Sequence, residues 1–139
     1  GWLYFGHIGD SRLYYLPASE GGIKQLSHDD TYVGWLFRQG KLSEWEAKQH
    51  PGRTSLQKAL GAGHQFVDPQ VGAVAYQKGD IFVLCSDGVV DGLFDNEIRR
   101  LLKDPEPAER QHDPAQRIVM TAVERSGRDN TTAIVIEIA

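Results

Sequence analysis

Apolar and polar positions divide the start of the chain into short β-type runs separated by turns. Residues 2–8 are rich in aromatic and β-favouring side chains and end at Gly9, which predicts a strand. Residues 13–16 are predicted to return as the second strand of a hairpin, and residues 23–26 to add a third strand after a turn at 17–22. The pattern therefore predicts an antiparallel meander.

Residues 31–50 change to a helical pattern. Gly40 is predicted to end a first short helix, and Ser43 to begin a second one, because Ser43 and Glu46 have the spacing of a capping box. Residues 54–60 are predicted to form a short helical or irregular segment. The first helix is marked by three apolar positions at helical spacing: Val33, Leu36 and Phe37.

Two apolar runs follow, at residues 71–76 and 81–85, and residues 77–80 between them have the composition of a tight turn. They predict a second β-hairpin. Residues 131–138 form another apolar run and predict a final strand.

Two longer helices are predicted in the second half of the chain. The first covers residues 95–103 with Asp95 as its cap, and the second covers residues 114–125, with Pro114 in the first turn. Antiparallel strands combined with helices placed late in the chain indicate the α+β fold class.

Composition narrows the function classes. The 139 residues are 40% hydrophobic and 24% charged, which suits one globular domain. The net charge of −4 comes without a basic run, so no nucleic-acid partner is expected. The longest apolar runs are far shorter than the roughly 20 residues of a membrane span. Cys85 is the single cysteine, and a cytoplasmic location is expected.

Three aspartates, Asp10, Asp87 and Asp129, each occupy a predicted tight turn beside an apolar β run. Mg²⁺ and Mn²⁺ prefer carboxylate oxygens, and the ends of strands hold such groups rigidly. Aspartate is also common in turns for another reason, since its side chain accepts hydrogen bonds from nearby backbone N–H groups. Taken singly, each residue fits that simpler role better; a shared metal site is the alternative.

Five sequence motifs follow one another along the chain: HIGDSRLY at 7–14, LSHDD at 26–30, LQKALG at 56–61, GDIFVLCSDG at 79–88 and GRDNTT at 127–132. They occur in the same order as in the PPM, or type 2C, protein phosphatases, and the chain resembles that family over nearly its whole length. The helical pair at 31–50 is similar to the bacterial members.

The resemblance implies a four-layer αββα fold, in which helices flank a sandwich of two antiparallel sheets. Residues 1–139 would be the C-terminal portion of one catalytic domain that is incomplete at its N-terminus, and residues 29–60 would be its flap segment. It also implies a centre of two Mg²⁺ or Mn²⁺ ions. Asp87 and Asp129 match metal ligands of the family, and Asp10 matches the aspartate that helps to hold a third ion.

The implied activity is the hydrolysis of phosphoserine and phosphothreonine in proteins by metal-activated water, within signalling that can include a paired serine/threonine kinase. The family's phosphate-clamping arginine, another acidic ligand and an Asp-Gly-x-Gly-Gly-His segment have no counterpart here. The chain alone is therefore expected to be nearly inactive, and to self-associate through strand edges left unpaired. The alternative function is a noncatalytic PPM-like module that regulates or scaffolds a partner.

Overall fold

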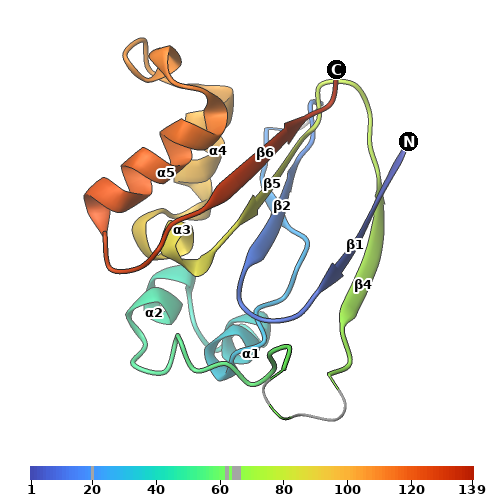
Figure 1. Ribbon diagram of the computed structural model, residues 1–139, viewed down its shortest axis with the longest axis vertical. Coiled ribbons are helices and arrows are strands. Elements are labelled where there is room, and N and C mark those ends of the chain that lie inside the picture. The colour runs from blue at the N-terminus through green and yellow to red at the C-terminus, as the bar shows by residue number, and fades with distance from the viewer. Residues whose placement is uncertain (20, 62, 64–66) are drawn as a thin grey trace.

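A computed structural model describes residues 1–19, 21–61, 63 and 67–139 as two antiparallel sheets, with a layer of helices on one side and two short helices at one end (Figure 1). A two-stranded sheet pairs β1 (Trp2–His7) with β4 (Gln70–Ala75). The four-stranded sheet has the order β3 (Lys24–Gln25), β2 (Arg12–Leu16), β5 (Ile81–Cys85) and β6 (Ala133–Glu137). The α+β prediction with antiparallel sheets is confirmed.

The helices fall into two groups. The layer against the four-stranded sheet contains α3 (Asp87–Gly92), α4 (Asp95–Lys103) and α5 (Pro114–Arg125), with a short 3₁₀ turn at Glu109–Gln111. Helices α1 (Tyr32–Arg38) and α2 (Glu44–Gln49) belong to the segment 29–60, which lies at the end of the sheets where β1 leads into β2 (Figure 1).

The main core lies between the four-stranded sheet and the helix layer. Alternate residues of β5 point to opposite faces, so Val83 packs towards the helices while Phe82 is buried on the other face and stacks on Tyr15 at a centroid distance of 5.0 Å. Helix α3 approaches α5 closely because Gly92 has no side chain; a Cβ there would lie 2.4 Å from the carbonyl oxygen of Ala122. Helix α3 is therefore held between the four-stranded sheet and α5.

Both predicted hairpins are wrong, although their strands exist. Strand β1 does not return into β2; it pairs with β4, while β2 pairs with β3 and β5. Strands β4 and β5 likewise belong to different sheets. The turn at 77–80 forms as expected, with Gly79 at φ +88°, but it carries the chain from one sheet to the other. Local patterns cannot distinguish these two uses of a turn.

Of the other local predictions, the capping box is confirmed and the cap of the helix at 95–103 is wrong. The capping box of Ser43 and Glu46 is present. Asp95 is the first residue of α4 and does not cap it; Glu97 instead accepts a hydrogen bond from the N–H of Phe94 at 2.8 Å. Within 54–60 no helix forms, and Leu56 makes a single β-bridge with Thr31. The predicted turn at 17–22 includes position 20, which lies outside the described residues.

None of the helices in the described ranges combines the length and apolar character that a membrane crossing demands.

Candidate metal site

The turn that carries Asp10 is held by the start of the segment 29–60. Gly9 adopts φ +107°, a conformation that favours glycine, and its N–H donates to the carboxylate of Asp30 at 3.0 Å. The N–H of Asp30 donates in return to the carbonyl of Gly9 at 2.8 Å. This reciprocal pair fixes the backbone directly before Asp10.

Asp87 and Asp129 are brought together by a close contact between the start of α3 and residues 130–132. The hydroxyl of Ser86 accepts from the N–H of Thr132 at 3.0 Å and donates to the carbonyl of Asn130 at 3.3 Å. Gly88 is necessary here, because a Cβ at that position would lie 2.4 Å from the carbonyl oxygen of Asn130. The sequence predicted that Asp87 lies in a tight turn. In the structure, Asp87 is instead the first residue of helix α3.

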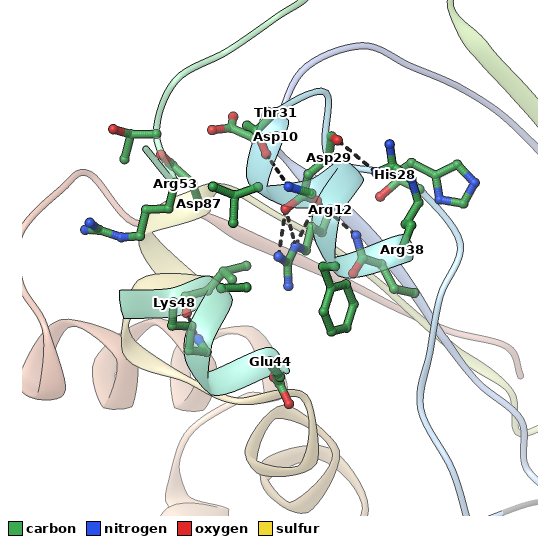
Figure 2. A pocket seen from close by; sticks show the side chains of 18 of the residues that line it. Asp10, Arg12, His28, Asp29, Thr31, Arg38, Glu44, Lys48, Arg53 and Asp87 are labelled. Carbon is green, nitrogen blue, oxygen red and sulfur yellow. Dashed lines mark hydrogen bonds and ion pairs between the residues drawn. The ribbon is translucent and has the colours of Figure 1, made fainter. Parts of the chain in front are cut away.

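Asp10 and Asp87 line one cavity of about 260 Å³, between the strand ends and the segment 29–60 (Figure 2). Burial, and then repulsion from Asp87, raises the pKa of Asp10. Burial, and then repulsion from Asp129, raises the pKa of Asp87. Asp10 and Asp87 thus share one cavity and repel each other, whereas Asp129 does not line that cavity and reaches Asp87 only through the repulsion between their charges.

The three aspartates offer carboxylate oxygens, which are the type of ligand that a hard cation prefers. The ion pairs identified among the described residues join lysines and arginines to other carboxylates and not to Asp10, Asp87 or Asp129. A divalent cation would relieve the repulsion between these carboxylates. No group of three or more His, Cys, Asp or Glu side chains among the described residues is arranged to hold a metal ion as it stands. Asp129 itself is exposed, and its carboxylate accepts from the N–H of Asn130 at 2.7 Å.

Arg12 lines the cavity, and the sequence did not identify this role. Its guanidinium donates twice to Asp29, from Nε to Oδ1 at 2.9 Å and from Nη2 to Oδ2 at 2.7 Å. Nη1 donates to the hydroxyl of Tyr14 at 2.9 Å, and that hydroxyl donates to Asp95 at 2.7 Å. A continuous polar network therefore joins β2, the segment 29–60 and the start of α4, and Figure 2 shows the part of it between Arg12 and Asp29.

A second ion pair lies nearer to Asp87. Arg53 donates from Nε to Oδ1 of Asp91 at 3.3 Å, and Asp91 lies one turn after Asp87 on α3. The only sequence signal for this contact would have been the helical spacing of Asp87 and Asp91, and the two glycines of α3 conceal that helix.

Cys85 and Ser86 precede Asp87 but do not form a nucleophilic centre. Burial raises the pKa of the Cys85 thiol to about 12, so the thiolate is scarce at neutral pH. The Ser86 hydroxyl is engaged with the backbone of residues 130–132. Neither residue has a histidine among its hydrogen-bond partners in the described part of the chain.

Several known proteins that are similar to this chain are protein phosphatases. No family model matches it. The serine/threonine protein phosphatase PstP of Mycobacterium tuberculosis is 38% identical over 132 residues, which cover 95% of this chain and 24% of PstP. The PPM phosphatase MsPP of Mycobacterium smegmatis, solved in complex with cacodylate, superimposes with a TM-score of 0.81 at 32% identity, covering 98% of this chain and 56% of that one.

A structure of the PstP catalytic domain in complex with two manganese ions gives a TM-score of 0.75 at 34% identity, covering 96% of this chain and 52% of that one. The chain thus spans about a quarter of the PstP protein and about half of the solved phosphatase chains. The sequence motifs and these matches agree: over nearly its whole length the chain is homologous to serine/threonine protein phosphatases of the PPM family, and it corresponds to a part of them.

Proposed function

We propose that this chain supplies part of the metal centre of an enzyme that removes phosphate from phosphoserine and phosphothreonine in proteins. The observation that carries the proposal is that Asp10 and Asp87 line one cavity and repel each other, while the contact of Ser86 with residues 130–132 joins the segment that carries Asp129 to the start of α3. Asp87 and Asp129 would hold two Mg²⁺ or Mn²⁺ ions, and Asp10 would contribute to a third.

Bound divalent ions would lower the pKa of water and neutralise the phosphate. The roles of the chain's own groups are positional. The contact between Ser86 and residues 130–132 holds the carboxylates of Asp87 and Asp129 near each other, and the pairing of Gly9 with Asp30 holds Asp10 beside them. Arg12 is committed to Asp29 and Tyr14, so it is not a free phosphate ligand.

The chain on its own is proposed to bind these ions weakly and to have little activity, because three carboxylates leave most coordination positions of two ions without a protein ligand. A cytoplasmic location, a phosphoprotein substrate and a paired serine/threonine kinase complete the proposal. A noncatalytic module is the second candidate; the absence of a group of three metal-ligating side chains among the described residues favours it.

A chimera distinguishes the two candidates. This chain would replace the matching 132 residues of M. tuberculosis PstP, so that the remaining part of the phosphatase comes from the relative. We expect hydrolysis of a phosphothreonine peptide that requires Mn²⁺ and stops with chelator. Alanine at Asp87 or Asp129 should abolish turnover, whereas Glu137→Ala, on the exposed end of β6, should leave it unchanged. Turnover that persists in the Asp87 or Asp129 variant would refute the assigned roles.

A further inference from the structure

The corner between α3 and α4 presents unpaired backbone groups to helix α2. At the end of α3, the carbonyl groups of Val90 and Leu93 lie beyond the last hydrogen bonds of the helix, and at the start of α4 the N–H of Asp95 has no partner inside the helix. Such groups require partners when they are covered. All three find them in the side chains of α2.

Lys48 serves the carbonyl groups. Its Nζ donates to the carbonyl of Leu93 at 2.6 Å and also to that of Val90, and it lies 4.7 Å from the centre of the Phe94 ring. Glu44, one turn earlier on the same face of α2, accepts from the N–H of Asp95 at 3.0 Å. Helix α2 thereby provides hydrogen-bond partners for the backbone groups at the end of α3 and at the start of α4.

The signs of the charges match the helix ends. Lys48 lies at the C-terminal end of α3, where the helix dipole favours a cation, and Glu44 lies at the N-terminal end of α4, where it favours an anion. Lys48 is half-buried, and burial, followed by the nearby charge of Arg12, lowers the pKa of its ammonium group. The free-energy cost of removing this ammonium group from water is offset by its hydrogen bonds to the two carbonyl groups and its contact with the Phe94 ring.

The same short helix α3 begins with Asp87. Because helix geometry fixes the relative positions of its residues, the contacts at the end of α3 act together with those at its start on the direction of Asp87. We propose that Lys48 is a positioning residue, which fixes α3 through the carbonyls of Val90 and Leu93 and so orients Asp87 for metal binding. This inference rests on the proposed function of Asp87.

The test compares Lys48→Met, which keeps the length of the side chain without its donors, with Lys48→Arg, which restores donors. Lys41→Met is the matched control, because Lys41 is exposed in the same segment and lies over the Trp35 ring, 4.9 Å from its centre. The 139-residue chain would be titrated with Mn²⁺ by calorimetry well below the unfolding temperature. We expect Lys48→Met to weaken binding about tenfold, with Lys48→Arg recovering most of the loss and Lys41→Met unchanged.

Hydrogen exchange separates this proposal from the metal hypothesis. In metal-free protein, the amides of Gly88 and Val89 should exchange faster in Lys48→Met than in the parent chain, while those of β5 should not change. Absence of Mn²⁺ binding in the parent chain would contradict the proposed weak metal binding by the isolated chain, and the exchange rates would still test the docking of α3. If Lys48→Met lowers thermal stability without altering either Mn²⁺ affinity or exchange at α3, Lys48 is merely structural and the proposal is wrong. Should Lys48→Met not fold, Glu44→Gln provides the same comparison at the other half of the corner.

Discussion

At the residue scale, two aspartates show how opposite surroundings give one side chain opposite roles. Asp80 is 2% exposed, and its carboxylate accepts from the Tyr15 hydroxyl and from the N–H groups of Ala18 and Gln77, each at 2.8 Å. Burial alone would raise its pKa, but these donors together lower it. Asp87 lacks such donors from distant segments, and burial with repulsion raises its pKa. The first aspartate stabilises the fold, whereas the second is suited to a ligand.

Replacing Asp80 by alanine should lower the free energy of unfolding by about 3 kcal/mol at neutral pH, because buried donors lose their acceptor. A lowered pKa in the folded state means that the stabilisation is present above the ordinary aspartate pKa and is lost as the pH falls through the folded-state value. The difference from the parent chain should therefore shrink in acid. Urea denaturation measures it, with Glu137→Ala on exposed β6 as control. An Asp80→Ala variant as stable as this control would show that the buried carboxylate is not a structural anchor.

Without metal, replacing Asp87 by asparagine should stabilise the fold, which is the opposite of the effect expected at Asp80. A raised pKa means that ionised Asp87 destabilises the fold as the pH rises through its folded-state value, so Asp87→Asn should melt at a higher temperature at pH 7 in chelator, and the gain should vanish in acid. Saturating Mn²⁺ should reverse the order, because only the parent chain gains binding energy. Equal melting temperatures under both conditions would argue that Asp87 carries no site-specific electrostatic cost.

At the element scale, the position of α3 matters most for the site. This helix begins at Asp87, contacts residues 130–132 through Gly88, packs on α5 through Gly92 and receives Lys48 at its other end. Sequence reasoning found the strands and the long helices, because their apolar periodicity extends over enough residues. It missed α3, since a six-residue helix with two glycines has no periodic signal and a low helix propensity.

Gly88 provides a test of this arrangement. Alanine at this position would bring a Cβ to within 2.8 Å of the Thr131 side-chain oxygen as well as against the Asn130 backbone, so α3 and residues 130–132 must separate. We expect a loss of about 2 kcal/mol in unfolding free energy, typical of overpacking. Gly6→Ala is the matched control, because a Cβ there meets no atom within 4 Å. Similar stabilities for the two variants would mean that the close approach is not required.

At the scale of the whole molecule, the sequence predicted the class of fold and the family but not the connections. Both expected hairpins failed, because a turn between two apolar runs looks the same whether its strands pair with each other or enter different sheets. The three aspartates could be named from motif order, yet their supports could not. Arg12 with Asp29, and Lys48 with Leu93, are contacts between segments that are distant in sequence and have no local pattern.

The outer face of the two-stranded sheet is apolar and open, because no helix among the described residues covers it (Figure 1). Trp2, Tyr4 and Val71 are 60%, 76% and 75% exposed. Since this area lies on a sheet with unpaired edges, we predict concentration-dependent self-association of the isolated chain, measured by sedimentation velocity. Val71→Lys should reduce it, whereas Met120→Lys, on exposed α5, should not. A monomeric parent chain at high micromolar concentration would contradict this.

The approach of Asp10 and Asp129 to Asp87 is the claim on which the assigned function depends, and paramagnetic NMR tests it directly. Mn²⁺ would be titrated into the ¹⁵N-labelled chain at substoichiometric levels, where signals near a bound ion broaden first. We expect amides around residues 10, 87 and 129 to broaden together, before those beside exposed carboxylates such as Asp104 and Glu137. Broadening spread evenly over surface carboxylates, or confined to one of the three positions, would contradict a shared metal site.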